Sequence, residues 1–236
     1  LQLAGKKELS GVINGSIESK GHFGTPIRMQ GTTRISQLAI FWKETPLIKG
    51  EDLMLLVQDD EISIPGMRLS LFDQGYFSIK GSGRLNKDLN LRADGNLPFE
   101  ILPMLTDRFS DAAGETQFSL EVNGSLTAPN VTVHADIRDG GMTIPGLLQK
   151  LHHLNGSVRM TSDAIFLDDI QGMLDTGKFE LKGTIGLDRY QPSDIALELK
   201  ADDLPITISD LLDVRLASEL DVRGSSEKSL IKGDVE

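Results

Sequence analysis

An eleven-residue pattern occurs twice in this chain and restricts the fold more than any other feature. Residues 71–81 (LFDQGYFSIKG) and 173–183 (MLDTGKFELKG) both read apolar, apolar, Asp, polar, Gly, any, Phe, any, aliphatic, Lys, Gly. In each copy the Asp-polar-Gly stretch is typical of a tight turn, and the alternation after it predicts a strand with one apolar face. Neither copy contains a nucleophile, a metal-ligand cluster or a phosphate loop. The repeat therefore predicts an architecture and not an active site.

The same alternation of apolar or small residues with polar ones extends over most of the chain, for example over residues 9–19 and 118–126. This period of two predicts β-strands with one buried face. Short helices are expected at three places: from about Pro98 to Phe109, where apolar residues recur at intervals of three and four, from Leu147 to Leu154, and from Ile208 to Leu212. The predicted fold class is all-β with a few short helices, mostly antiparallel.

Other residues repeat with nearly the same period. Gly11, Gly21 and Pro26 align with Gly114, Gly124 and Pro129, and Leu97-Pro98 aligns with Leu204-Pro205. We therefore expect a first β-groove repeat at residues 1–113 and a second at 114–215, each ending in a short helix, followed by the truncated start of a third at 216–236. A closed sandwich has no reason to recur in series. The repeats therefore favour an elongated, curved, taco-like sheet whose concave face forms a groove.

The composition excludes several functional classes. The formal net charge is −11, which argues against nucleic acid and against electrostatic binding to anionic lipid. The chain has no Cys, so disulfide scaffolds and Cys-ligated metals are excluded. No apolar run approaches the ~20 residues of a membrane helix. Because both ends fall within strand patterns, we interpret the chain as a segment of a longer protein.

Acidic and histidine pairs are the residues that most resemble a chemical site. His152-His153 is expected on a solvated helix face, because adjacent helical residues point in different directions and no carboxylate lies at i±4. Asp168-Asp169 and Asp202-Asp203 are expected at strand ends beside turns, where Asp is common. Asp59-Asp60-Glu61 is expected in a solvated loop. No catalytic, cofactor or metal residues are predicted, and we do not expect an enzyme.

The apolar strand face is the strongest functional candidate. Gly31, Gly81, Gly83 and Gly183 would allow that face to curve strongly. The residues expected to line the groove and to contact lipid or another apolar ligand are Phe77, Ile79, Phe118, Leu120, Val122, Phe179, Leu181, Leu197 and Leu199.

These patterns resemble the repeat region of the TamB and AsmA-like envelope proteins. The residues that carry the resemblance are Gly114-x-x-x-Phe118-x-Leu120-x-Val122-x-Gly124-Ser125-Leu126-x-x-Pro129-Asn130-Val131, Gly172-Met173-Leu174-Asp175-x-Gly177-x-Phe179-x-Leu181-x-Gly183, and Leu204-Pro205. The first copy departs from the pattern at residues 21–26, where the usual Leu is absent.

The resemblance implies a β groove with a hydrophobic interior that crosses the periplasm of the bacterial envelope. It implies an inner-membrane anchor outside this chain and an outer-membrane barrel of the TamA type as partner. It also implies roles in outer-membrane protein assembly and in phospholipid transport, and it brings no catalytic residues.

The leading hypothesis is a groove that carries phospholipid or another acyl-chain ligand between the two membranes, assists outer-membrane protein assembly, or does both. One alternative is a chaperone-like module that pairs its sheet edge with an incoming strand. A structural β-solenoid or adhesin segment is the other alternative.

Overall fold

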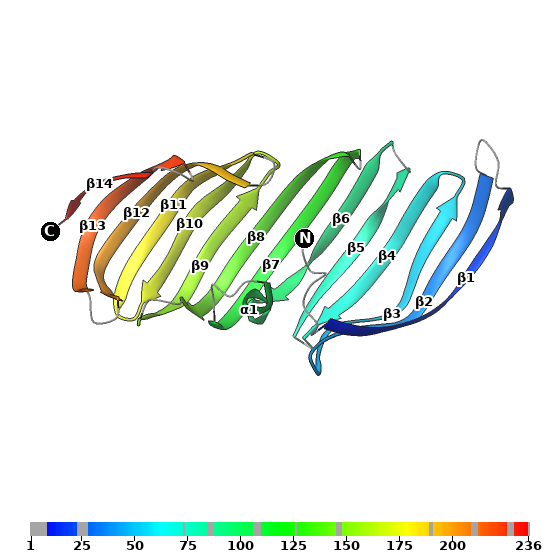
Figure 1. The fold of residues 1–236 in the computed structure, drawn as a ribbon, viewed down its shortest axis with the longest axis horizontal. Coiled ribbons are helices and arrows are strands. Elements are labelled where there is room, and N and C mark those ends of the chain that lie inside the picture. Colours follow the sequence, from blue (N-terminus) through cyan, green and yellow to red (C-terminus); the bar gives the residue numbers. More distant parts are fainter. Residues whose placement is uncertain are drawn as a thin grey trace. The chain divides into compact units, whose positions relative to one another are not determined.

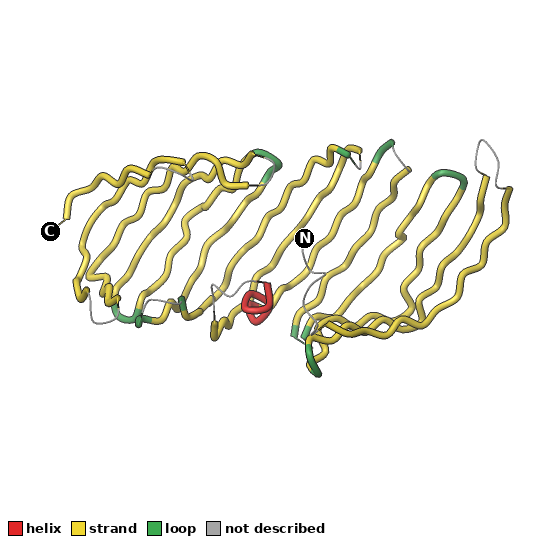
Figure 2. The backbone as a smooth tube through the Cα atoms, in the orientation of Figure 1, coloured by secondary structure: helices red, strands yellow, loops and turns green. Residues whose placement is uncertain are grey.

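The computed structural model describes residues 9–22, 28–72, 74–84, 87–105, 110–125, 127–144, 148–188, 191–208, 212–225 and 229–235. Nearly all of them lie in strands joined by short turns (Figure 1, Figure 2). A three-residue 3-10 helix and a four-residue α-helix are the helical elements of the described part. The predicted all-β, mostly antiparallel class is confirmed.

Contacts divide the chain into two compact units. Unit 1 comprises Leu1–Leu97 and Ser119–Asn130, and unit 2 comprises Pro98–Phe118 and Val131–Glu236. This division concerns packing, and the repeat boundaries at residues 113 and 215 stay a prediction.

Unit 1 is built from strands that pair antiparallel with their neighbours in sequence. Consecutive pairing of this kind needs only tight turns as connections. The strands are β1 (Leu9–His22), β2 (Arg28–Trp42), β3 (Thr45–Gln58), β4 (Glu61–Leu71), β5 (Gly75–Arg84) and β6 (Leu89–Pro98).

Unit 2 follows the same rule from β8 to β14. It also contains the helices η1 (Phe99–Ile101) and α1 (Leu102–Leu105), and residues of β7 (Ser110–Ser125) and β8 (Ala128–Thr143) are divided between the units. The remaining strands are β9 (Lys150–Met160), β10 (Ala164–Leu174), β11 (Gly177–Asp188), β12 (Gln191–Ile208), β13 (Leu212–Ser225) and β14 (Ser229–Val235).

The two copies of the eleven-residue pattern fold alike. Gly75 and Gly177 each begin a strand directly after a turn. Gly81 and Gly183 have φ angles of +146° and +141°, which L-residues rarely adopt. A Cβ at Gly183 would also lie 2.2 Å from the carbonyl oxygen of Ala196 on the neighbouring strand. Glycine is thus required here by both conformation and space.

Bulges interrupt the regular register inside several strands of unit 2. The pairing shifts between Ile137 and Gly140, between Leu167 and Ile170, and between Ala201 and Leu204. Within these three shifts lie Asp139, Asp169 and Asp203, whose φ angles are +47°, +49° and +50°. A bulge adds one residue to a strand and bends it, and Asp tolerates the left-handed conformation better than most residues.

The Asp pairs were therefore placed wrongly. Asp168-Asp169 and Asp202-Asp203 lie at bulges inside β10 and β12, and not at strand ends beside turns. In each pair the second Asp takes the left-handed backbone conformation of the bulge.

A bulge also explains why the helix predicted from Leu147 to Leu154 was wrong. Leu151 and Leu154 were expected in a helix but belong to β9, and Leu147 lies outside the described residues. Their spacing of three arises because the pairing of β9 shifts at His153, whose φ is +52°. One extra residue in a strand turns a spacing of two into three, which resembles the spacing of a helix.

The other two helix predictions differ in outcome. The helix expected from Pro98 to Phe109 is present as η1 and α1 up to Leu105, and residues 106–109 lie outside the described ranges. Of the helix expected near residue 210, Ile208 ends β12 and Leu212 begins β13, while residues 209–211 are not described.

Replacing Gly183 with Ala tests the backbone requirement of the repeated pattern. We expect the free energy of unfolding to fall by about 1–3 kcal/mol, because the added Cβ strains φ and collides with the next strand. Urea unfolding followed by circular dichroism measures it.

Gly186→Ala is the matched control in the same strand, since no left-handed φ is found there and a Cβ would first meet the Oγ of Ser193 at 3.0 Å. Its effect should stay within about 1 kcal/mol. Equal losses of unfolding free energy in the two variants would contradict the conclusion that position 183 requires glycine.

Candidate functional site: the apolar face of the sheet

Cross-strand pairing aligns aliphatic side chains into rows in unit 2. Residues directly opposite each other in an antiparallel sheet project from the same face. Ile170 pairs with Leu181, Leu181 with Leu199, and Leu199 with Leu220. A second row contains Leu167, Gly183, Leu197 and Val222. Four of the predicted lining residues, namely Phe179, Leu181, Leu197 and Leu199, are therefore brought onto one face.

Unit 1 carries the same arrangement. Phe77 lies between Leu69 and Gly95, and Ile79 lies between Met67 and Ala93. Phe77 and Ile79 are half-buried, like most residues of these rows. The predicted lining residues Phe118, Leu120 and Val122 are half-buried in β7, with exposed or charged residues between them. Their contact with a ligand stays a prediction for all nine residues.

Outside the Phe99 region, the described residues form no second layer over the apolar face of the kind that covers a sandwich core. Among the described residues no side chain is less than 2% exposed. The accessible surface is 15486 Å². A compact protein of 25.8 kDa would expose about 10,500 Å², and two separate compact domains of half that mass about 12,600 Å². The rows therefore remain accessible to an apolar ligand.

One part of the apolar face in unit 2 is filled by the chain itself. Phe99 of η1 is 7% exposed and packs in a cluster with Ala112, Met142, Leu154 and Ile170. Gly140 makes room for this ring, since a Cβ there would lie 2.6 Å from Cε2 of Phe99. Phe179 and Leu181 pack against the cluster. Part of the surface of these two predicted lining residues is therefore covered by the protein's own side chains.

The opposite face of unit 2 carries ion pairs. Lys182 Nζ lies 2.9 Å from Glu198 Oε2, and Lys200 Nζ lies 2.7 Å from Glu219 Oε1. The hydrogen bond from Lys200 lowers the pKa of Glu219, and the same bond raises the pKa of Lys200. The hydrogen bond to Glu198 likewise raises the pKa of Lys182. These exposed ion pairs make this face polar and hydrated, in contrast to the face that carries the aliphatic rows.

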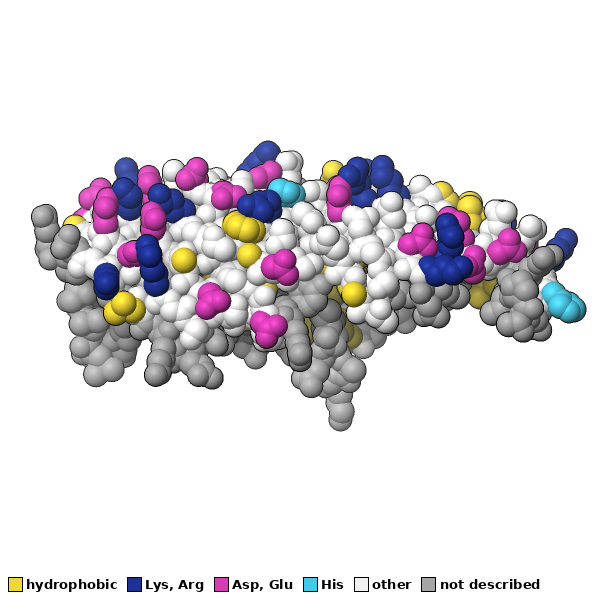
Figure 3. Space-filling model, turned by 90° about the horizontal axis from the view of Figure 1, so that it is seen from above, with side chains coloured by type: hydrophobic (Ala, Val, Ile, Leu, Met, Phe, Trp, Pro, Cys, Tyr) yellow, Lys and Arg dark blue, Asp and Glu magenta, His cyan; other side chains and the backbone are white. Residues whose placement is uncertain are grey.

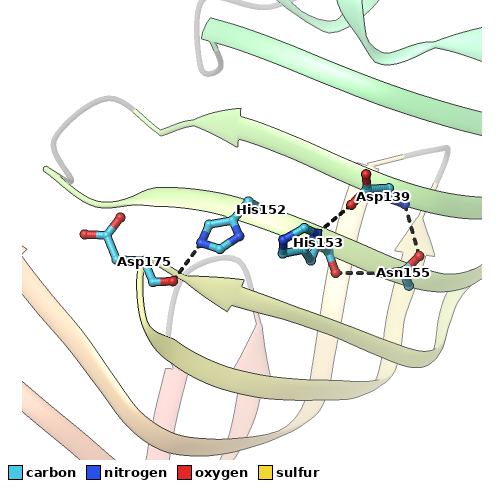
Figure 4. Close-up of polar contacts among 5 residues, drawn as sticks. All are labelled: Asp139, His152, His153, Asn155 and Asp175. Carbon is cyan, nitrogen blue, oxygen red and sulfur yellow. Dashed lines mark hydrogen bonds and ion pairs between the residues drawn. The ribbon is translucent and has the colours of Figure 1, made fainter.

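His152 and His153 lie on a strand and not on a helix, contrary to the sequence-based expectation (Figure 4). The His153 Nδ1 lies 2.7 Å from Asp139 Oδ1, and the backbone N–H of Asp139 donates to Asn155 Oδ1 at 3.0 Å. His152 Nε2 lies 2.7 Å from the carbonyl oxygen of Asp175. These contacts fix two neighbouring bulges and the β10–β11 turn, which is a structural role.

The described residues contain no group of three or more His, Cys, Asp or Glu that could hold a metal ion. Asp59 and Asp60 form the turn between β3 and β4, as the expected loop requires, whereas Glu61 begins β4. In the part of the chain that the structure describes, no helix is long and apolar enough to cross a membrane.

Sequence reasoning missed the Phe99 cluster and the bulge positions. The signal for the bulges was present: an Asp or His follows one or two positions after an apolar residue, and the next apolar residue comes a position late. The contact of Phe99 with Gly140 had no local signal, because the two residues are distant in sequence.

Comparison with known proteins gives one family match. The model of the TamB C-terminal domain matches residues 168–236. The protein SUBSTANDARD STARCH GRAIN 4, chloroplastic, of Oryza sativa subsp. japonica is 25% identical over 155 residues. The match covers 65% of this chain but 7% of the rice protein, so the chain spans a small part of that relative. No solved structure matches the chain.

Replacing Phe99 with Ala tests whether the cluster holds η1 on the sheet. We expect a loss of about 3–5 kcal/mol in the free energy of unfolding, since a large buried ring leaves a cavity. Leu148→Ala is the control, because this side chain is 68% exposed and its removal should cost less than about 0.5 kcal/mol. Similar urea midpoints for both variants would contradict the packing role.

The Lys200–Glu219 pair predicts a pH dependence. The pKa of Glu219 is lowered from its ordinary value of 4.5, so its contribution is present above that value and is lost as the pH falls through the lower folded-state pKa. The pKa of Lys200 is raised from 10.5, so its contribution is lost at strongly alkaline pH. Glu219→Gln should lower the thermal midpoint slightly near pH 7, and the difference should vanish in acid and shrink with added salt.

Glu51→Gln provides the control, since Glu51 is an exposed strand residue with no ion pair among the described residues. A Glu219→Gln difference that persists unchanged below pH 3 would rule out the ion pair as its cause.

Proposed function

We propose that the apolar face of this TamB-like chain, a segment of a bacterial envelope protein, holds lipid acyl chains during transfer between the inner and outer membranes. The match over residues 168–236 confirms the family predicted from the sequence. The observation that carries the proposal is the half-buried aliphatic row Leu181–Leu199–Leu220, which continues from the buried Ile170 and whose opposite face is lined by ion pairs.

The rows suit a flexible apolar chain. Neighbouring strands are about 4.8 Å apart, so a row across four strands offers contacts over roughly 14 Å. Each methylene that leaves water contributes about 0.8 kcal/mol before the costs of binding. An acyl chain makes no directional bonds with these side chains, so it can slide from one row to the next. The proposed role is binding and guidance, without catalysis.

The family supplies the rest of the proposal. The periplasmic location, the inner-membrane anchor in a segment outside this chain and the outer-membrane barrel of the TamA type are expected from TamB-like proteins. No partner of nucleic acid type is proposed, in keeping with the acidic net charge.

A second candidate function is pairing with strands of outer-membrane proteins. The observation that favours it is β1, which forms an outer edge of unit 1 and pairs with β2 among the described strands. Its residues from Ser10 to His22 are all exposed, with Ile13 at 65% and Ile17 at 76%. Exposed edges with apolar side chains are templates for added strands.

Leu199→Glu tests the acyl-chain proposal. A carboxylate within the row is costly to desolvate beside an acyl chain, so binding of phospholipid from phosphatidylethanolamine vesicles should weaken at least about tenfold. Ala196→Glu is the matched control, because it adds the same charge to β12 on the opposite face, where it is exposed and pairs with Arg223. Lipid bound to the reisolated chain is measured by mass spectrometry.

Photo-crosslinkers at Leu199, Ala196 and Ile17 separate the two candidates in cells. Lipid adducts at Leu199 but not at Ala196 support acyl-chain binding. Adducts with unfolded barrel proteins at Ile17, combined with no lipid at Leu199, would replace it with strand pairing. Equal lipid binding by Leu199→Glu and Ala196→Glu would overturn the groove as the binding surface.

A further inference from the structure

Unit 1 contains a small apolar hollow near the β5–β6 turn. We call it the rim hollow. Its volume is about 160 Å³, and its lining residues are Ile62, Ile64, Gly83, Arg84, Asp88, Leu89 and Leu91. Its lining is almost wholly apolar. Because Ile62 pairs with Gly83 and Gly83 with Leu89, the hollow belongs to the same face as the row of Phe77.

Glycines lie in the two rows of residues that line the rim hollow. In each of two adjacent rows a glycine lies between an Ile and a Leu: Gly81 between Ile64 and Leu91, and Gly83 between Ile62 and Leu89. The backbone requires Gly81, as its φ of +146° shows. Gly83 has no such φ, and a Cβ there would meet the Asp88 carbonyl oxygen at 3.0 Å and Leu89 Cδ1 at 3.1 Å. A Cβ at Gly83 would therefore be crowded by its neighbours, and a larger side chain there would take up space within the rim hollow.

Charges of both signs border the rim hollow. Arg84 Nε lies 3.7 Å from Asp88 Oδ1, and Lys87 Nζ lies 2.9 Å from Asp60 Oδ2. The hydrogen bond from Lys87 lowers the pKa of Asp60. The two turns that carry these residues lie along the upper edge of Figure 1, and the view from above in Figure 3 shows cationic and anionic side chains together there. Asp59 and Glu61 lie beside Asp60, so the described charged residues at these two turns are two cations and four anions.

We propose that the rim hollow binds a lipid headgroup at the end of the apolar face of unit 1 and selects zwitterionic amine-containing phospholipids. The lipid phosphate accepts hydrogen bonds from Arg84, its ammonium donates to Asp88, and the first methylenes of one acyl chain occupy the space above Gly83. Apolar protein cavities of about 150 Å³ hold a six-carbon ring, so the volume suits a short stretch of chain. This inference rests on the proposed acyl-chain function and adds the lipid class.

The excess of carboxylates at the rim favours this lipid class over an anionic one. A headgroup whose only charge is a phosphate would pair with Arg84. It would also face the carboxylates of Asp88 and Asp60 without bringing a cation of its own. A headgroup that carries an ammonium offers a partner to each member of the Arg84–Asp88 pair. The net charge of −11 on the chain disfavours anionic lipid further.

Gly83→Val fills the rim hollow and tests its use. The probe is dihexanoyl phosphatidylethanolamine, titrated into the whole chain with isotope-labelled Ile methyl groups. In the unaltered chain the Ile62 and Ile64 methyl signals should shift, and Gly83→Val should weaken binding at least about fivefold. Gly186→Val is the control, since a Cβ there is equally close to a neighbour, at 3.0 Å, but lies in β11. Its affinity should stay within about twofold.

Asp88→Asn tests the headgroup contact. The unaltered chain should bind the phosphatidylethanolamine probe several-fold more tightly than phosphatidylglycerol with the same chains. Asp88→Asn should remove most of that preference, and Arg84→Gln should weaken both lipids. Equal affinity of the unaltered chain for the two lipids, or an unchanged preference in Asp88→Asn, would overturn the headgroup assignment.

The outcomes separate this inference from the proposed function. If the unaltered chain binds lipid, Leu199→Glu weakens it and Gly83→Val does not, the acyl-chain function stands and the rim hollow is excluded. If the unaltered chain binds neither phosphatidylethanolamine from vesicles nor the dihexanoyl form, the acyl-chain function and the rim-hollow assignment are both overturned.

Discussion

The ladder of antiparallel hydrogen bonds between consecutive strands is the interaction on which the rest of this structure depends. No side chain in the described part is fully buried, so the fold does not rest on a closed hydrophobic core. Each unit is held by pairing of strands with their sequence neighbours, and unit 2 is reinforced by aliphatic rows on one face and ion pairs on the other. A sheet stabilised in this way can leave its apolar face accessible, and that accessibility is the basis of the proposed function.

Bulges modify this ladder without breaking it. At Asp139, His153 and Asp169 one strand gains a residue, the backbone takes a left-handed conformation and the strand bends. Side-chain contacts such as His153 with Asp139 hold neighbouring bulges together. The polar residues that looked most like a chemical site in the sequence therefore shape the sheet. The proposed function rests instead on the aliphatic rows.

The two faces and the rim divide the chemistry of binding. Aliphatic rows provide non-directional contact along which a chain can move, while the Phe99 cluster fills part of the face in unit 2. The rim of unit 1 adds what the rows lack, a hollow of defined size beside Arg84 and Asp88. In the proposed function, sliding contact and a selective end are compatible because they involve different residues.

The sequence by itself determined the all-β class, the alternation that separates the faces, the repeated glycines and the resemblance to TamB, because each depends on local pattern. Most of the apolar row could also be predicted, since residues such as Leu197 and Leu199 alternate regularly. Only the tertiary structure decided that Leu151 and Leu154 lie in a strand, since an i,i+3 spacing fits both a helix and a bulged strand. It also decided where Phe99 packs and which charges meet at the rim, because those contacts join residues that are brought together only when neighbouring strands pair.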